Sequence, residues 1–242
     1  MNPDGIRGVL FDLDDTLMDH RGAAEDALRT WAGHVGLRIS HEELVITWEV
    51  LERRYYELYQ RGALTRTEQR RARIRELMSA PDLDNRDADA MFETYWDLYR
   101  SAWRTFPDAE DAVDRALSAG LRVGVLTNGD HRDQRSKIEA TALAGFDLPV
   151  FASSRLPAAK PDPRAFQSAC AALEVDPSEC LMVGDSLVND VGGAVNAGLS
   201  AALVDRAGAH RGEPGAYRVI SSLTDLHFGC GPGQGVPKLQ KY

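Results

Sequence analysis

Phe11-Asp12-Leu13-Asp14-Asp15-Thr16-Leu17 is the stretch that decides the fold, because it ends the first apolar run of the chain with closely spaced carboxylates. Residues 6–12 have the continuous apolar character of a short buried strand. Asp12 and Asp14 are separated by one residue, so both carboxylates can point toward one crevice where the strand gives way to a loop. The sequence therefore predicts a buried strand that delivers two acids to its carboxyl end.

Two simpler interpretations compete for this stretch. A calcium-binding loop also begins with this acid spacing, but it needs glycine at the position of Leu17 and glutamate at that of Ala23. The other interpretation makes the carboxylates solvated residues that cap the following helix. The motif alone leaves this second alternative open, so the rest of the chain has to decide.

Strands and helices alternate from about residue 120 onward. Asp162 is expected to be the N-cap of a helix that opens at Pro163. Near-continuous apolar strands that alternate with helices predict an α/β fold with a doubly wound, parallel, Rossmann-like sheet. The expected later strands are 121–127, 149–152, 180–184 and 200–204, and the other expected helices are 131–144 and 188–197.

The segment 18–104 contains no convincing strand and carries apolar residues at helical spacing. It predicts an all-helical domain inserted after the first strand, with helices at about 22–35, 41–60, 66–79 and 86–104. Residues 1–17 and 105–228 would then form the Rossmann-like core. The glycine- and proline-rich segment 229–242 is expected to be a flexible tail.

Composition excludes several classes of protein. The chain has 242 residues, with 28 basic and 37 acidic side chains and a net charge of −9, which argues against nucleic-acid binding. No stretch approaches the ~20 apolar residues of a membrane helix, and the start of the chain does not resemble a secretory signal. Three unpaired-looking cysteines, Cys170, Cys180 and Cys230, favour a reduced, cytoplasmic compartment. A monomer or a homodimer is expected.

Three further polar segments follow later strands of the expected sheet. They are Thr127-Asn128-Gly129, Lys160-Pro161-Asp162-Pro163 and Gly184–Asp190. Because an open α/β sheet binds its ligands outside the carboxyl ends of its strands, we expect these segments to meet the first motif in one crevice.

The side chains of that crevice favour a particular chemistry. Several converging carboxylates repel one another unless they are protonated or bind a metal, and hard oxygen ligands suit Mg²⁺. A lysine, a threonine hydroxyl and backbone amides suit the oxygens of a phosphoryl group. An ionised aspartate can attack phosphorus. No histidine or cysteine cluster supports zinc.

The four segments together resemble the motifs of the haloacid dehalogenase-like (HAD) hydrolase superfamily. These segments are Phe11–Leu17, Leu126–Gly129, Lys160–Pro163 and Gly184–Asp190, and their order and approximate spacing agree with that family. The position of the helical insertion is similar to that of the family's helical cap, which follows the first motif. The resemblance implies a magnesium-dependent enzyme on a Rossmann-like core.

The acids acquire roles from this resemblance. Asp12 would be the nucleophile and a magnesium ligand, and Asp185 would be a further ligand. Asp14 would protonate the leaving group and then activate water, while its backbone carbonyl binds the metal. Asp15 is expected to serve local structure.

The remaining motif residues also acquire roles from the resemblance. Thr127 and Asn128 would bind the phosphoryl oxygens, and Lys160 would neutralise charge on the nucleophile and the phosphoryl group. Asp190 would position Lys160 or a metal-bound water from behind. Thr16 is expected to form a hydrogen bond within the first-motif turn.

Asp14 favours phosphoester chemistry over dehalogenation, since the founding dehalogenases of the family lack this second aspartate. No lysine precedes Lys137, so the insertion offers no Schiff-base lysine. The expected activity is that of a phosphatase that acts on a small phosphorylated metabolite, such as a sugar phosphate or a nucleotide. A sugar phosphomutase or phosphotransferase, and a noncatalytic binding protein on the same fold, remain alternatives.

The sequence of the insertion indicates functional residues less clearly than the four motifs do. His20 and Arg21 are candidates for contact with the leaving group, although a hinge and a solvated first turn explain them more simply. The arginines of 66–75 are expected to form a solvated face paired with Glu68 and Glu76. The insertion's tryptophans are expected mainly to pack between its helices. Lys137, outside the insertion, is expected to be an exposed helix residue.

Overall fold

The computed structural model describes residues 5–210 and 217–228, so the expected tail at 229–242 lies outside the described residues. The chain forms two compact units. One comprises Met1–Asp19 and Thr105–Tyr242, and the other comprises His20–Arg104. The chain passes from the first unit to the second between Asp19 and His20 and returns between Arg104 and Thr105.

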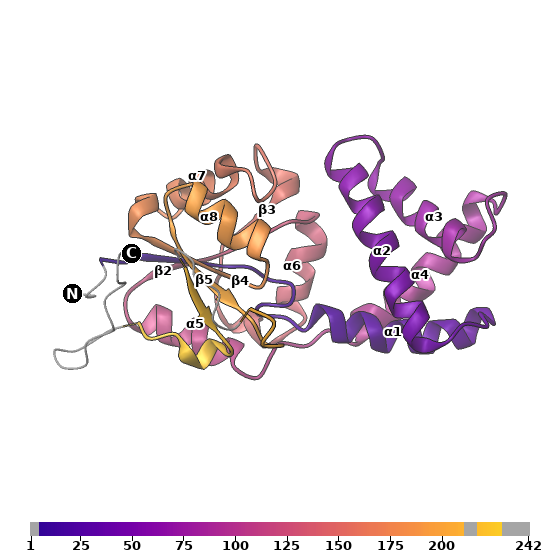
Figure 1. The fold of residues 1–242 in the computed structure, drawn as a ribbon, viewed down its shortest axis with the longest axis horizontal. Helices are drawn as coiled ribbons and strands as arrows, with labels where there is room; N and C mark the ends of the chain where they lie inside the picture. Colours follow the sequence, from indigo (N-terminus) through magenta and orange to yellow (C-terminus); the bar gives the residue numbers. More distant parts are fainter. Residues whose placement is uncertain (1–4, 211–216, 229–242) are drawn as a thin grey trace. The chain divides into compact units, whose positions relative to one another are not determined.

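The first unit is built on a parallel sheet (Figure 1). The strand order is β3-β2-β1-β4-β5-β6, and every neighbouring pair is parallel. This confirms the predicted α/β class, but the short edge strand β6 was not predicted. The strands are β1 (Gly8–Phe11), β2 (Arg122–Thr127), β3 (Val150–Ala152), β4 (Cys180–Gly184), β5 (Ser200–Val204) and β6 (Arg218–Ile220).

The strand β1 lies at the centre of the sheet, between β2 and β4. All four of its residues are buried, as its apolar sequence requires of a strand covered on both faces. Phe11 is in register with Val125 and with Val183. The next residue, Asp12, therefore leaves the sheet between the carboxyl ends of two neighbouring strands.

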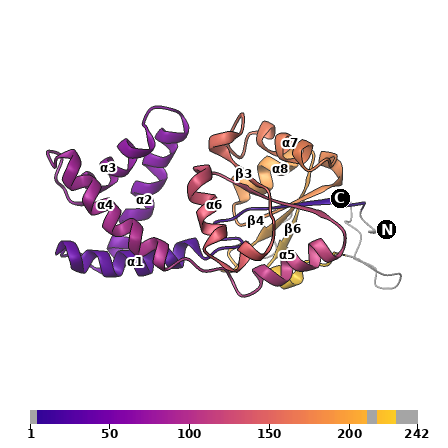
Figure 2. The same cartoon turned by 180° about the vertical axis from the view of Figure 1, so that it is seen from behind.

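Helices cover both faces of this sheet. Figures 1 and 2 show α7 (Pro163–Ala172) and α8 (Gly193–Asn196) on one face and α5 (Ala109–Ser118) on the other. The predicted N-cap of α7 is present, because Asp162 accepts a hydrogen bond from the amide of Arg164 at 2.9 Å.

Two expected helices are divided in the structure. The segment predicted as 131–144 forms α6 (His131–Glu139) and a separate 3-10 turn, Ala142–Gly145. The segment predicted as 188–197 begins with the π-helical turn Leu187–Gly192 and continues as α8. In that wide turn, Asp190 folds back so that its carboxylate accepts a hydrogen bond from the amide of Ser186 at 3.0 Å. Short 3-10 turns also occur at Ser153–Arg155, Pro177–Glu179 and Leu223–Asp225.

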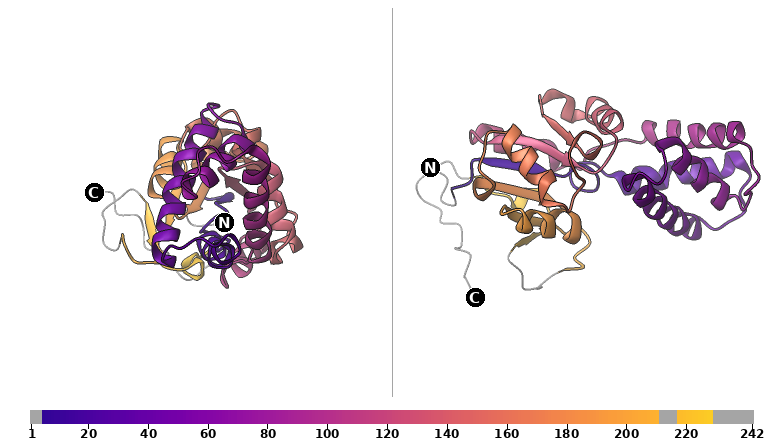
Figure 3. Two further views of the ribbon diagram at one scale, coloured as in Figure 1. Left: turned by 90° about the vertical axis from the view of Figure 1, so that its right-hand side faces the viewer. Right: turned by 90° about the horizontal axis from the view of Figure 1, so that it is seen from above.

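The second unit consists of four helices, seen from further sides in Figure 3. Trp31 and Trp48 are buried at its centre, as their helical spacing predicts, and each indole N–H has a partner. Trp31 donates to the carbonyl of Met91 at 2.9 Å, and Trp48 donates to the hydroxyl of Tyr95 at 3.2 Å. The helices are α1 (His20–Val35), α2 (His41–Gln60), α3 (Arg66–Leu77) and α4 (Asn85–Ser101).

Two arginines of α3, Arg71 and Arg73, do not lie on the solvated face that their charge predicts. Arg73 is 4% exposed, forms an ion pair with Glu52 at 2.9 Å, and lies 4.1 Å from the centroid of the Trp48 ring. Arg71 pairs with Asp89 at 2.6 Å instead of with a glutamate of its own helix. Aromatic faces attract guanidinium groups, and this attraction, together with acids from other helices, explains why Arg71 and Arg73 depart from the expected pairing with Glu68 and Glu76.

Among the described residues, no helix has both the length and the apolar composition that crossing a membrane demands.

The two chain segments that lead to and from the second unit meet at the edge of the first. Met18 and Thr105 form an antiparallel bridge. The amide of Phe106 donates to the carbonyl of Leu17 at 2.9 Å. These bonds join the start and the end of the insertion immediately after the first motif.

Arg206 links the first-motif loop to Asp108, the residue that precedes α5. Its guanidinium donates to the carbonyl of Thr16 at 3.0 Å and to both carboxylate oxygens of Asp108 at 2.9 and 3.0 Å. Asp108 also accepts from the hydroxyl of Ser222 and the amide of Leu223. Burial by itself raises the pKa of Asp108, but these hydrogen bonds outweigh it and lower the pKa to about 2.

Replacing Asp108 with asparagine should therefore destabilise the protein. The lowered pKa corresponds to about 2 kcal/mol of stability. A lowered carboxyl pKa stabilises the fold above its ordinary value of 3.8 and loses that contribution as the pH falls toward 2. Urea unfolding at pH 7 and at pH 3 measures the difference between wild type and Asp108→Asn. A difference that does not shrink on acidification would contradict this account.

Candidate active site

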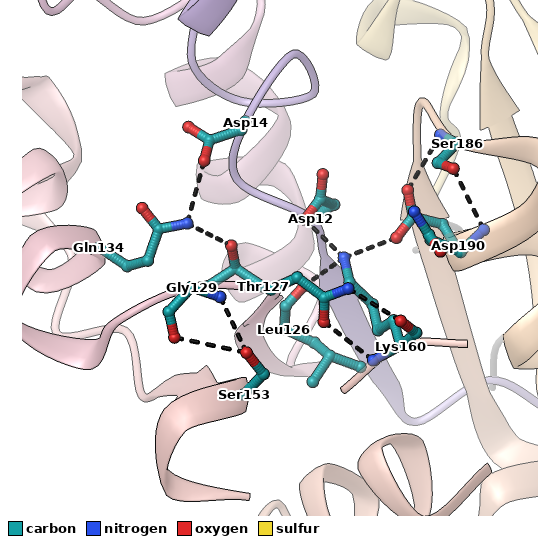
Figure 4. Close-up of polar contacts among 12 residues, drawn as sticks. Asp12, Asp14, Leu126, Thr127, Gly129, Gln134, Ser153, Lys160, Ser186 and Asp190 are labelled. Carbon is teal, nitrogen blue, oxygen red and sulfur yellow. Dashed lines mark hydrogen bonds and ion pairs between the residues drawn. The ribbon is translucent and has the colours of Figure 1, made fainter. Parts of the chain in front are cut away.

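Five predicted side chains lie at the carboxyl edge of the sheet, where parallel strands bring their ends together. Figure 4 shows four of them: Asp12, Thr127, Lys160 and Asp190. Asp12 follows β1, Thr127 ends β2, and Asp185 follows β4. Lys160 lies in the loop before α7, and Asp190 lies in the π-helical turn after β4.

Lys160 is the centre of this cluster. Its ammonium group donates to Asp12 at 2.6 Å, to Asp190 at 2.6 Å and to the carbonyl of Leu126 at 2.9 Å. These three acceptors match the three hydrogens of the ammonium group. Burial opposes the charge, but Asp12 and Asp190 more than compensate and raise the pKa of Lys160. The side chain is therefore a fixed cation.

The backbone of Lys160 is fixed as well. The side-chain amide of Asn128 donates to the carbonyl of Lys160 and accepts from its amide, each at 2.8 Å. Asn128 was predicted to bind the substrate, yet in the structure its side chain secures the loop that carries the lysine.

Three carboxylates gather beside this lysine. Ligand oxygens of Asp12, Asp185 and Asp190 all lie within 4.8 Å of one another. Burial raises the pKa of Asp12, and the charges of Asp190 and Asp185 act in the same direction, whereas Lys160 lowers it. A hard divalent cation would relieve this repulsion, so the donor set fits Mg²⁺. Asp190 is already held by Lys160 and by the amide of Ser186, so Asp12 and Asp185 are the acids better placed to serve as ligands.

The first-motif loop is closed by its backbone. The amides of Leu17 and Met18 both donate to the carbonyl of Leu13, at 3.0 and 2.8 Å. Asp15 has a φ of 59°, a left-handed conformation that aspartate tolerates better than most residues, which agrees with a role in local structure. The hydroxyl of Thr16 is buried without a hydrogen-bond partner in the described part of the chain, so its expected bond within the turn is wrong.

Sequence reasoning missed two residues of α6. Lys137 was expected to be exposed, but its side chain is only 6% exposed. Its Nζ lies 2.6 and 2.8 Å from the two carboxylate oxygens of Asp14. Gln134 donates to Asp14 at 3.0 Å and to the hydroxyl of Thr127 at 2.5 Å (Figure 4). The available signal was helical spacing, since residues 134, 137 and 138 share one helix face and Ile138 is apolar.

His20 and Arg21 belong to the helical unit and make contacts with other residues of that unit. His20 Nδ1 lies 2.6 Å from the hydroxyl of Tyr99, and Nε2 lies 3.7 Å from Glu52. Arg21 lies 3.5 Å from Glu49. These contacts position both side chains within the unit, and a contact with substrate stays a prediction.

The carboxyl edge of this parallel α/β sheet surrounds a buried lysine with carboxylates, an arrangement suited to a divalent cation and an anionic group. The sequence profile of the haloacid dehalogenase-like hydrolase family matches residues 6–198. The chain belongs to this family of hydrolases, and its curated relatives place it with the family's phosphatases.

Two of these relatives align with most of the chain. N-acylneuraminate-9-phosphatase of Rattus norvegicus is 29% identical over 91% of this chain and 92% of its own. Phosphoglycolate phosphatase of Salmonella paratyphi A is 30% identical over 80% of this chain and 79% of its own. The fold is similar to that of the HAD-hydrolase YfnB of Bacillus subtilis bound to magnesium, with a TM-score of 0.76 and 21% identity over 90% of this chain and 96% of that one.

Gly184 is the residue that lets Asp190 approach the sheet. A Cβ at this position would overlap Cγ and Oδ2 of Asp190. Gly184→Ala should therefore push Asp190 away from Lys160 and lower the free energy of unfolding by about 1–3 kcal/mol. Gly145→Ala is the matched control, because its Cβ would have no heavy atom within 4 Å. Denaturant unfolding of both variants measures the effect, and equal stability of the two would argue against this packing constraint.

Proposed function

We propose that this protein is a magnesium-dependent phosphatase that hydrolyses a small phosphorylated metabolite through an aspartyl phosphate on Asp12. The observation that carries the proposal is the placement of Asp12 at 2.6 Å from the buried ammonium of Lys160, within a cluster of three carboxylates. A fixed cation beside a carboxylate suits the approach of a dianionic phosphoryl group, because it offsets the repulsion between the two anions.

The acids of this edge supply a site for the metal. Magnesium bound by Asp12, Asp185 and the backbone carbonyl of Asp14 would offset negative charge on the phosphoryl group. Asp190 would hold Lys160 in place, since one of its oxygens accepts from the lysine and the other from the Ser186 amide.

The chemistry would proceed in two displacements at phosphorus. A carboxylate oxygen of Asp12 attacks phosphorus while the bond to the leaving oxygen breaks, and Asp14 gives that oxygen a proton. Asp14 then takes a proton from water, the water oxygen attacks phosphorus, and the bond to Asp12 breaks. The products are the alcohol and inorganic phosphate, and both aspartates return to their starting states.

The phosphoryl oxygens would be held by Lys160, by the Thr127 hydroxyl and by backbone amides that include that of Asn128. Gln134 donates to this hydroxyl at 2.5 Å, so Thr127 can direct its own proton toward a phosphoryl oxygen. The side chain therefore acts as a donor whose orientation is set before the substrate binds.

The substrate class follows from the relatives and from the helical unit. Two of the relatives are named for N-acylneuraminate 9-phosphate and phosphoglycolate, which are small phosphorylated metabolites. The helical unit is proposed to act as a cap that excludes water and recognises the leaving group, with His20 and Arg21 as candidate contacts. A sugar phosphate, a nucleotide or a related metabolite is the expected substrate.

Phosphate release from a panel of phosphorylated metabolites tests this function. We expect turnover that EDTA abolishes and added Mg²⁺ restores. Asp12→Asn should reduce turnover by about 1,000-fold or more, since no nucleophile remains. Asp15→Asn is the matched control, because it removes a neighbouring carboxylate and asparagine accepts the same left-handed backbone. No turnover by the wild type on any panel member, or full activity of Asp12→Asn, would overturn the proposal.

Asp14→Asn separates the two half-reactions. Because Asp14 is assigned a proton transfer in each, we expect both the formation and the hydrolysis of the aspartyl phosphate to slow by about 100-fold. Rapid-quench measurement of the phosphorylated enzyme follows both steps. Loss of only one of them would show that the two roles do not belong to one residue.

A further inference from the structure

One face of α6 supplies hydrogen-bond donors to the first two motifs. Lys137 contacts both carboxylate oxygens of Asp14, at 2.6 and 2.8 Å. Gln134 uses its side-chain amide to join Asp14 to Thr127, at 3.0 and 2.5 Å (Figure 4). Residues three apart on a helix lie on the same face, so both donors come from one rigid element.

The burial of Lys137 indicates how firmly this arrangement is held. Its side chain is 6% exposed, whereas that of Asp14 is 26% exposed. Lysine is rarely buried without a partner, because removing an ammonium group from water is costly. Asp14 provides this partner through both oxygens, so the contact fixes the plane of the carboxyl group as well as its position. The ammonium charge also favours the ionised form of Asp14, which opposes protonation of the leaving oxygen, so the alkyl ester compared below shows whether positioning outweighs this effect.

We propose that Lys137 is a positioning residue that holds the carboxyl group of Asp14 in the orientation needed for proton transfer to the leaving oxygen. Gln134 would fix the position of Asp14 relative to Thr127, because its side-chain amide bonds to both. This inference rests on the proposed function, in which Asp14 protonates the leaving oxygen. Lys137 acts through Asp14 and has no contact of its own with the reacting atoms.

The inference makes the role of Lys137 depend on the leaving group. An alkyl phosphate needs a proton on its leaving oxygen, whereas p-nitrophenyl phosphate releases a stable phenolate with little help. A displaced Asp14 should therefore impair the alkyl ester selectively. Because kcat/KM covers the steps up to departure of the leaving group, it is the quantity to compare.

The experiment measures kcat/KM for an alkyl phosphate from the panel and for p-nitrophenyl phosphate. Lys137→Met should lose about 100-fold on the alkyl ester, with little change on the aryl ester. Lys137→Arg keeps the cation and should recover part of the loss. Arg135→Met is the matched control, because it removes a half-exposed cation of the same helix that pairs with Glu139 at 2.9 Å.

Each result decides the inference. An equal loss on both esters would mean that Lys137 acts on the phosphoryl group or on the fold, and an unchanged or faster alkyl reaction would mean that it does not position Asp14. If circular dichroism shows that Lys137→Met does not fold, Lys137→Gln carries the same comparison with the same selective loss expected. A wild type inactive on both esters and on the panel overturns the proposed function itself and this inference with it.

Discussion

The site depends on one buried ammonium group. The side chain of Lys160 is only 3% exposed, so solvent does little to stabilise its charge and its three acceptors must be present together: Asp12, Asp190 and the carbonyl of Leu126. These acceptors come from the loop after β1, from the π-helical turn after β4 and from β2. A buried ion group of this kind is stable only when every member is satisfied, so the lysine fixes the relative positions of three strand ends.

Much of the core could be predicted from the sequence. Buried parallel strands have continuous apolar sequences, and polar residues at or directly after their ends mark the carboxyl edge of the sheet. Asp12, Thr127 and Asp185 could therefore be assigned to one edge from the sequence alone. The strand β6 could not be predicted, because Arg218–Ile220 begins with an exposed arginine, offers only two apolar residues and joins the sheet through pairing with β5. The turn at Leu187–Gly192 is π-helical, although the sequence predicts an α-helix from residue 188. The contact between the Asp190 carboxylate and the Ser186 amide accompanies this wider turn, and helical spacing gives no sign of it.

The errors that matter most concern long cationic side chains. Lys137 and Arg73 were both expected in solvent because charge alone favours exposure. Both are buried, one against Asp14 and the other between Glu52 and the Trp48 ring. Their apolar stems pack readily while the charged head reaches a partner from a distant part of the chain. Such partners are set by tertiary structure, and a local pattern cannot reveal them.

The bridge between Met18 and Thr105 has a consequence for how the chain is organised. We call the two chain segments at Leu17–Met18 and Thr105–Phe106 the neck of the insertion. They join it to the core and are hydrogen-bonded to each other. Loop-closure entropy grows only slowly with the number of residues enclosed, and here the ends are already joined. The size of the inserted unit is therefore nearly independent of the geometry of the first motif, and the same neck could carry a short turn or a large domain. The first-motif loop and the length of the inserted unit can thus change separately.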